Sequence, residues 1–354
     1  MHNTTQNILA NKKGTGIVLS FGELLLRLCP DSAGNWLQQN KLPFYVGGAE
    51  ANVATALALW QVPAAYVSAV PDNLLGRQLV QYLDEKGIDV SRMVFGGERL
   101  GLYFLPKGKD LKNAAVIYDR AGSSFSQLKP GSIDWDEMLD GVRWLNLSAI
   151  SPAINNAIAA LCAEGAAAAA QKSIVVSLDL NYRSKLWQYG KEPNEIMPGI
   201  VTYCDVVMGN IWAAEKMLDC KLDGEKIKSG LKEAYVEQAQ QTSKEIIQRF
   251  PNVKAVANTF RFDQSPHPVH YYATLFNAGT YSVSATYTLE KMLDNVGSGD
   301  CFMAGLIYGF FKNLTFQQTV DFAAAAAVNK LTEAGDATSS TVENIQRAIK
   351  EHER

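Results

Sequence analysis

The chain has 354 residues, of which 47% are hydrophobic and 19% charged, with a formal net charge of −3. This composition is typical of a globular protein with a sizeable core, and the lack of a basic excess argues against a nucleic-acid partner. Five scattered cysteines without a Cys-x-x-Cys pair indicate neither a disulfide framework nor a zinc site. Residues 1–14 lack the apolar stretch of a signal peptide, and no run approaches the roughly 18 apolar residues of a membrane span. We therefore expect a cytoplasmic protein without a membrane partner.

The N-terminal part of the chain alternates between strand and helix patterns. Ile17–Phe21 is predicted to be a buried strand that Glu23–Leu28 continues, and Ala64–Val70 is predicted to be a second strand. Helices are predicted at Thr55–Trp60 and Leu74–Lys86. Strand, helix, strand, helix at this spacing indicates a parallel sheet with crossover helices.

Residues 93–123 interrupt this alternation. Leu102–Leu105 and Ala115–Tyr118 are short strand-like segments separated by a turn-rich stretch at 106–110, which predicts a hairpin outside the main sheet. Together with residues 27–46, this hairpin would form a small β lid over a cleft. Further short apolar runs, with helical stretches between them, extend the main sheet: Trp144–Leu147, Ile174–Leu178, Val206–Met208 and Val253–Ala257. We predict one doubly wound α/β domain over 1–354, with a mainly parallel sheet flanked by helices and lid segments at approximately 27–46 and 93–123.

A glycine-rich turn with a carboxylate precedes an apolar, helix-patterned run at 294–313. Gly297 and Gly299 would allow backbone angles closed to other residues, so that the N–H groups around Ser298 point into one concavity. The helix that follows would add its own unpaired N–H groups and its positive dipole end. Such a site favours a phosphate, and Asp300 could take the proton of a hydroxyl that attacks this phosphate. Asp is also common at helix starts, so on these residues alone a purely structural role is equally open.

Two common nucleotide-binding motifs are absent. No Gly-x-x-x-x-Gly-Lys-Ser/Thr sequence occurs, and Phe21-Gly22-Glu23-Leu24 stands where a Gly-x-Gly-x-x-Gly turn would follow the first strand. The sequence therefore disfavours both a Walker-type NTPase and a standard dinucleotide dehydrogenase.

Two segments in the order of a known family account for the glycine-rich turn. Asp294–Gly305 resembles the second signature of the ribokinase-like, or PfkB, carbohydrate kinases, which usually begins Asp-Thr-Thr-Gly-Ala-Gly-Asp, and Gly47–Ala58 resembles the first. The predicted lid also falls where that family has its lid, and the resemblance extends from Ile17 to the final helix. It implies a sugar kinase that uses ATP and Mg²⁺, and it allows a monovalent cation near Asp294 and a homodimer formed through the lid.

Two arginines indicate the class of substrate. Residues 118–123 and 177–187 resemble segments of the 2-keto-3-deoxygluconate kinases within this family. A guanidinium group holds a carboxylate by two charge-assisted hydrogen bonds, which a neutral sugar cannot supply. Arg120 from the lid and Arg183 after a core strand could converge on one end of the cleft, although each could instead pair with a nearby acid. The predicted reaction is phosphorylation of 2-keto-3-deoxy-D-gluconate at its terminal primary hydroxyl. A kinase of a neutral sugar, of the fructokinase or ribokinase type, and a non-catalytic sugar-acid sensor remain alternatives.

The resemblance also implies roles for individual residues. Asp300 would be the general base, and Gly297, Ser298 and Gly299 would supply the N–H groups that stabilise the transferred phosphoryl group. The sugar acid would contact Gly48, Asn52, Tyr103, Tyr118, Arg120, Ile150, Arg183 and Asp336, and ATP would contact Asn210, Thr259, Gly297 and Gly299. Asn52 could instead bond its own backbone at a helix start, and Tyr103 and Tyr118 could be cross-strand packing partners.

Two positions depart from the family pattern. The magnesium-associated Asn-x-x-Glu of the family would map to Asn210–Ala213, where Ala replaces Glu and Glu215 lies two residues later. No metal ligand is therefore assigned. Ala257–Arg261 replaces the usual glycine-containing strand end, which leaves Thr259 as the residue there that could reach a phosphate.

Overall fold

The computed structural model describes residues 16–30, 36–38, 40–106, 116–262, 268–277 and 279–352. Within them, the main sheet has nine strands in the order β14-β13-β12-β11-β10-β9-β1-β4, with β15 paired to β13. The parallel strands are β4 (Ala64–Val67), β1 (Ile17–Phe21), β9 (Val142–Ser148), β10 (Val175–Asp179), β11 (Val206–Gly209) and β12 (Ala255–Phe262). The antiparallel edge comprises β13 (Val269–Asn277), β14 (Thr280–Val283) and β15 (Tyr287–Leu289). The predicted mainly parallel α/β sheet is therefore confirmed.

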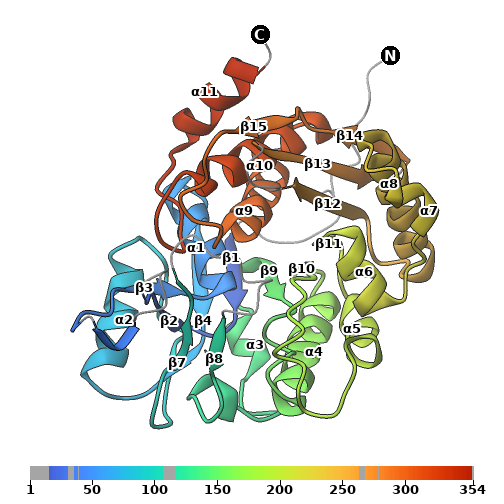
Figure 1. The fold of residues 1–354 in the computed structure, drawn as a ribbon. Coiled ribbons are helices and arrows are strands. Elements are labelled where there is room, and N and C mark those ends of the chain that lie inside the picture. Colours follow the sequence, from blue (N-terminus) through green and yellow to red (C-terminus); the bar gives the residue numbers. More distant parts are fainter. Residues whose placement is uncertain are drawn as a thin grey trace.

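Helices cover both faces of this sheet (Figure 1). Successive side chains of a strand point to opposite faces, so on β1 Val18 packs into one core and Leu19 into the other. The first core is covered by α1 (Ala49–Leu59), α2 (Leu74–Asp84), α9 (Ser298–Phe311), α10 (Phe316–Leu331) and α11 (Val342–His352). The second is covered by α3 (Trp135–Met138), α4 (Asn156–Gln171), α5 (Pro193–Val201), α6 (Ile211–Leu218) and part of α8 (Lys232–Arg249), while the short α7 (Gly224–Lys228) lies beside α8. None of the described helices combines the length and the apolar character needed to cross a membrane.

A separate four-stranded sheet, here called the lid sheet, has the order β3 (Phe44–Gly47), β2 (Leu25–Leu28), β7 (Gly101–Phe104), β8 (Ile117–Asp119). Its strands lie within or beside the two segments assigned to the lid. The turn predicted between β7 and β8 lies, apart from Pro106, outside the described residues.

Two predicted strands differ from the observed ones. Glu23–Leu28 does not continue β1, because Leu25–Leu28 pair with β3 and β7 of the lid sheet. Gly22, which follows β1, packs against the Glu50 carboxylate so closely that a Cβ atom would collide with it. Ala64–Val70 is likewise divided at Ser68 into β4 and the short β5 (Ala69–Val70), which pairs with β6 (Val94–Phe95).

Helices α9 and α10 pack closely because small residues face each other. Ala323–Ala327 on α10 are completely buried. A Cβ atom at Gly305 on α9 would lie 2.5 Å from the Cα atom of Ala323, which is closer than real Cβ atoms approach. This contact fixes the position of α9, whose first residues form the glycine-rich turn.

We expect Gly305→Ala to lower the free energy of unfolding by about 1–3 kcal/mol, because the added methyl group overpacks this contact. The matched control is Gly199→Ala on α5, where an added Cβ atom would meet no atom within 4 Å. That control should be neutral or stabilising by up to about 1 kcal/mol. Urea denaturation measures both variants, and equal losses of stability would contradict the packing argument.

Candidate active site

A cleft of about 540 Å³ lies between the lid sheet and the carboxyl ends of the parallel strands, the usual position of ligand sites in such sheets. It brings together all the residues predicted for the site: Gly48, Asn52, Tyr103, Tyr118, Arg120, Ile150, Arg183, Asn210, Thr259, Gly297, Ser298, Gly299, Asp300 and Asp336. The lining also includes residues that the sequence reasoning missed, among them Asp179, Asn181, Lys216, Arg261 and Tyr271.

The anion turn, residues 294–299, includes the N-cap of α9 and its first two residues. Gly297 caps the helix with φ 82°, and a Cβ atom there would collide with the carbonyl oxygen of Asp336, so the position requires glycine. Gly299 differs from the prediction, because it lies inside the helix without a positive φ and has room for a Cβ atom. The Ser298 hydroxyl donates to the Ala327 carbonyl at 3.1 Å, which turns the side chain toward α10 and leaves its backbone for the cleft. The anion site thus depends on one glycine in the left-handed region and on the start of the helix.

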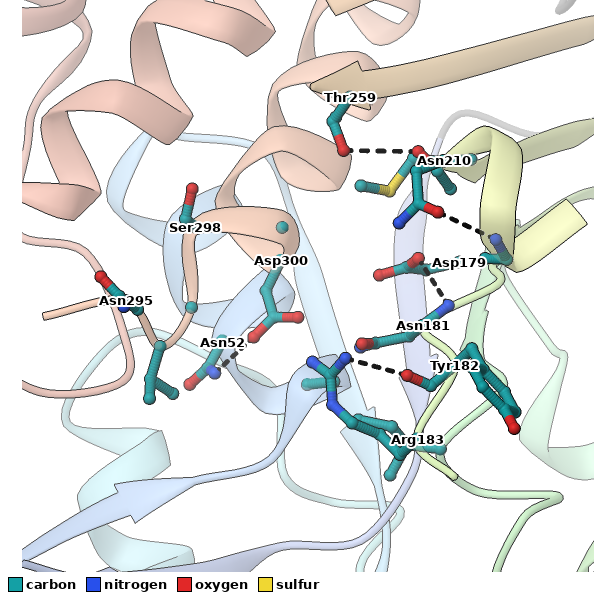
Figure 2. A pocket seen from close by; sticks show the side chains of 18 of the residues that line it. Asn52, Asp179, Asn181, Tyr182, Arg183, Asn210, Thr259, Asn295, Ser298 and Asp300 are labelled. Carbon is teal, nitrogen blue, oxygen red and sulfur yellow. Dashed lines mark hydrogen bonds between the residues drawn. The ribbon is translucent and has the colours of Figure 1, made fainter. Parts of the chain in front are cut away.

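Asp300 and Asn52 form a hydrogen bond across the cleft (Figure 2). The Asn52 side-chain amide donates to Oδ2 of Asp300 at 2.7 Å. Helix α1 begins at Ala49, earlier than predicted, so Asn52 lies inside the helix and does not bond its own backbone as the alternative assumed. Asp300 is the third residue of α9, whose N-cap is Gly297, so it is not the capping residue either. Both side chains are therefore directed at the cleft.

Burial raises the pKa of Asp300 to about 8. The hydrogen bond from Asn52 acts in the opposite direction, while the charge of Asp179 adds to the rise and that of Arg183 reduces it. Burial also raises the pKa of Asp179 to about 6 and that of Glu50 to about 7. A carboxyl group with a pKa near neutrality is well matched to accepting a proton at physiological pH.

This pKa predicts how stability depends on pH. The pKa of the Asp300 carboxyl group is about 8 in the folded chain and has its ordinary value of 3.8 in the unfolded chain, so the folded chain binds this proton more tightly. As pH rises between these two values, the stabilisation that comes from the bound proton is progressively lost. Asp300→Asn cannot titrate, and we expect its stability relative to the wild type to increase from pH 5 to pH 8 and then to level off. Urea denaturation across this range measures the difference, and a difference independent of pH would contradict the assignment.

Arg183 reaches the cleft from the segment after β10. The Asp179 carboxylate accepts from the Asn181 backbone N–H at 3.0 Å and so shapes this segment. The Arg183 guanidinium donates to the Tyr182 carbonyl at 3.1 Å, while its buried Nε has no hydrogen-bond partner. Figure 2 shows the guanidinium group directed toward Asp300. Among the residues that the structure describes, no carboxylate forms an ion pair with Arg183.

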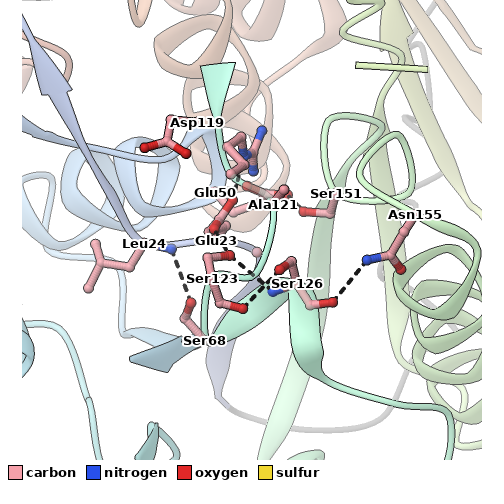
Figure 3. Close-up of polar contacts among 12 residues, drawn as sticks. Glu23, Leu24, Glu50, Ser68, Asp119, Ala121, Ser123, Ser126, Ser151 and Asn155 are labelled. Carbon is pink, nitrogen blue, oxygen red and sulfur yellow. Dashed lines mark hydrogen bonds and ion pairs between the residues drawn. The ribbon is translucent and has the colours of Figure 1, made fainter. Parts of the chain in front are cut away.

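Arg120 has a different environment, which includes two buried acids, Glu23 and Glu50, that Figure 3 shows beside Ser123 and Ser151. Its Nε forms an ion pair with Glu23, which also accepts a hydrogen bond from the Ser123 hydroxyl, and both Arg120 and Glu23 are buried. Glu50 lies nearby and accepts from Ser151 at 2.8 Å. Arg120 therefore pairs with a nearby acid through its Nε, which is the structural alternative to binding a substrate. Of the two arginines, Arg183 is the one whose guanidinium group is free of an ion pair with any described residue and could bind a ligand carboxylate.

Asp336 and the lid tyrosines are linked to a buried arginine. Tyr103 donates its hydroxyl to Asp336 at 2.6 Å, and it also stands opposite Tyr118 with ring centroids 6.2 Å apart, so the packing role is present as well. Arg27 lies against both Asp336 and Asp294. The family resemblance allows a monovalent cation near Asp294. In the structure, the Asp294 carboxylate is paired with the guanidinium group of Arg27.

The other end of the cleft is lined by polar and basic side chains. Asn210 caps α6 by accepting from the Ala213 N–H at 2.8 Å, and Thr259 donates to the Gly209 carbonyl at 3.3 Å. Lys216 and Arg261 also line this part. Both could have been found from the sequence. Residues two apart on a strand share a face, so Arg261 lies on the same side as Thr259, and residues about one helical turn apart share a face, so Lys216 lies on the same side as Ala213.

The structure offers no cluster of metal ligands within its described residues. Glu215 does not line the cleft, and no group of three or more His, Cys, Asp or Glu side chains could hold a metal ion in this part of the chain.

Comparisons with known proteins agree with this arrangement. Residues 17–343 match the family model described as pfkB family carbohydrate kinase. The chain is 25% identical to a 2-dehydro-3-deoxygalactonokinase from Haloferax volcanii, covering 95% of this chain and 97% of the relative. It resembles the crystal structure of a 2-dehydro-3-deoxygluconokinase from Thermotoga maritima with a TM-score of 0.85 and 32% identity, covering 95% of this chain and 100% of the other. It is also 27% identical to a 5-dehydro-2-deoxygluconokinase from Geobacillus kaustophilus, covering 85% of this chain and 84% of the relative. The chain belongs to the pfkB family of carbohydrate kinases.

Proposed function

We propose that this kinase transfers a phosphoryl group from ATP to the terminal primary hydroxyl of 2-keto-3-deoxy-D-gluconate. The observation that carries the proposal is Arg183, which lines the cleft with Asp300 and forms no ion pair with a carboxylate among the described residues. A substrate with a carboxylate at one end and a hydroxyl at the other would place the carboxylate at the arginine and the hydroxyl at Asp300. The relatives named above act, by their names, on deoxy keto sugar acids, which supports the same class of substrate.

In this proposal, Asp300 accepts the proton of the substrate hydroxyl as its oxygen attacks the terminal phosphorus of ATP. Asn52 orients the carboxylate through its hydrogen bond of 2.7 Å. The N–H groups at Gly297, Ser298 and Gly299, together with the positive end of α9, stabilise the negative charge on the transferred group. Thr259 and Asn210 contact ATP, and Mg²⁺ bound with ATP would neutralise its phosphate charge.

The remaining cleft residues would hold the sugar acid. Gly48 and Ile150 contact it from the core, while Tyr103 and Tyr118 contact it from the lid sheet, whose closure excludes the water that would compete as phosphoryl acceptor. Asp336 has lone pairs left for a sugar hydroxyl beside its bond from Tyr103.

A kinase of a neutral sugar is the second candidate. The pairing of Arg120 with Glu23 favours it, because a guanidinium group whose Nε is already engaged has less to offer a substrate carboxylate. A non-catalytic sensor of sugar acids remains the candidate from another class.

Measuring ADP release with a panel of substrates distinguishes the three functions. The panel contains 2-keto-3-deoxygluconate, its galactonate epimer, 5-keto-2-deoxygluconate, fructose and ribose. We expect the highest kcat/KM for 2-keto-3-deoxygluconate. A higher value for fructose or ribose would contradict the proposal, and calorimetric binding of a sugar acid without turnover of any compound would identify a sensor.

We also propose that two copies of the chain pair in the cytoplasm through the lid sheet. Four apolar residues stand opposite one another across it, in the order Phe44, Leu28, Phe104, Ile117. The end residues of this row, Phe44 and Ile117, are 58% and 50% exposed, while Leu28 and Phe104 between them are half-buried. Apolar side chains exposed at both ends of one sheet face favour a partner. Light scattering of the purified chain tests it, since a monomer at micromolar concentration would contradict the pairing.

A further inference from the structure

One arginine that the sequence reasoning did not single out joins the lid sheet to the anion turn. Arg27 lies on the lid strand β2 and is completely buried. We propose that Arg27 is a positioning residue, whose guanidinium group holds the anion turn in the geometry that receives the phosphates of ATP. The inference rests on the proposed phosphoryl transfer and adds to it the residue that sets the phosphate site.

The contacts of Arg27 reach both segments that enclose Gly297. Its Nη1 and Nη2 atoms donate to the two oxygens of Asp294 at 3.0 and 2.5 Å, a two-pronged contact at the head of the anion turn. Its Nε lies 2.8 Å from Oδ1 of Asp336, a close contact of charges without hydrogen-bond geometry. The guanidinium group also lies over the ring of Tyr45, 4.8 Å from its centroid. The side chain therefore has a single fixed position.

Both acids contact the anion turn, Asp294 through its carboxylate and Asp336 through its main-chain carbonyl. Asp294 accepts from the Val296 N–H at 3.3 Å, which holds the chain immediately before Gly297. Asp336 presents its carbonyl oxygen to Gly297 so closely that no side chain fits there. A shift of either acid would therefore move the N–H groups at the start of α9.

The lid sheet places Arg27 by strand pairing. Tyr45, Arg27, Tyr103 and Tyr118 stand opposite one another on four adjacent strands, and Tyr103 donates to the same Asp336 carboxylate. This polar row alternates with the exposed apolar row at Phe44 and Ile117, as expected for the two faces of one sheet. The lid sheet and the anion turn thus share one buried network.

Electrostatics give the network a role beyond stability. Asp336 lines the cleft and Asp294 is buried beside the anion turn, so without a cation the two negative charges would repel incoming phosphates. The positive charges of Arg27 and the buried Lys330 compensate these negative charges. Burial lowers the pKa of Lys330, while the charges of Asp294 and Asp336 act in the opposite direction. Buried ion pairs often contribute little net stability compared with apolar residues. The arrangement is therefore better explained by positioning and by charge neutralisation than by its contribution to folding.

The test compares Arg27→Lys, Arg27→Met and the double variant Arg27→Met with Asp294→Asn. Arg27→Met leaves two buried acids without their partner and should lower stability, whereas the double variant removes one of these charges and should regain part of it. We expect the double variant to stay about 10–100-fold below wild-type kcat, since a displaced phosphate site costs rate even in a folded enzyme. Its KM should rise more for ATP than for the sugar. Arg27→Lys keeps the charge but loses the two-pronged contact with Asp294, so its kcat should lie between those of the wild type and the double variant.

The surface variant Arg77→Met is the matched control, because Arg77 pairs with Asp72 while 64% exposed, and it should leave kcat and both KM values unchanged. Recovery of kcat together with stability in the double variant, or wild-type kinetics in Arg27→Lys, would overturn the positioning role. If the wild-type chain turns over no sugar, the proposed function fails, and titration calorimetry with ATP alone then decides about Arg27. ATP affinity in the folded double variant equal to that of the wild type would overturn the inference.

Discussion

Asp300→Asn is expected to lower turnover by about 10²–10⁴-fold, the range for the loss of a positioned general base. Asparagine has nearly the same shape as aspartate and can still accept the hydrogen bond from Asn52, so the cleft should keep its geometry. Affinity for the sugar acid, measured by calorimetry, should therefore change little. The variant separates the proton-accepting role of the carboxylate from its role in packing.

The matched control is Asp179→Asn, the same exchange of acid for amide within the same cleft. Asp179 raises the pKa of Asp300 through its charge, and its carboxylate accepts from the Asn181 N–H, which an asparagine oxygen can also do. This variant keeps the base and should retain far more turnover than Asp300→Asn. More than a tenth of wild-type turnover in Asp300→Asn, or an equal loss in the two variants, would remove Asp300 from the role of base.

The main sheet could be predicted because its strands carry local signals. Buried strands such as Val206–Gly209 are short apolar runs, and helical stretches separate them. Once the strands are parallel, their carboxyl ends meet at one edge, which brings Asp179 and Asn210 together although they lie far apart in sequence. The failure at Glu23–Leu28 has a physical reason, because Leu25–Leu28 pair with the lid strands β3 and β7, and pairing with distant segments leaves no local pattern in the sequence.

The ion pairs of the site could not be predicted from a single sequence. Arg27 and Asp294 are separated by 267 residues, and no local pattern indicates that a lid arginine is buried against the anion turn. The same applies to Arg120, whose partner Glu23 comes from the segment after the first strand. At Gly299 the motif predicted too much. A glycine in the signature indicated backbone angles closed to other residues, but Gly299 has no positive φ and is an ordinary helical residue.

The choice between a sugar acid and a neutral sugar depends on Arg183. Arg183→Ala should lower kcat/KM for 2-keto-3-deoxygluconate by about 10–100-fold, the equivalent of one lost set of charge-assisted hydrogen bonds. The value for fructose should change by less than about threefold, because fructose has no carboxylate to lose a partner. The kcat/KM of Arg183→Lys for 2-keto-3-deoxygluconate should lie between those of the wild type and Arg183→Ala, since lysine keeps the charge without the two-pronged geometry.

Lys216→Ala is the control for a general effect of charge, because it removes a cation from the other end of the same cleft. It should weaken ATP binding and leave the ratio between the acid and the neutral sugar unchanged. If Arg183→Ala weakens both sugars equally, Arg183 does not recognise a carboxylate. Arg120, with its Nε already held by Glu23, would then be the remaining cation predicted to recognise an acid, and the neutral-sugar kinase would become the better explanation.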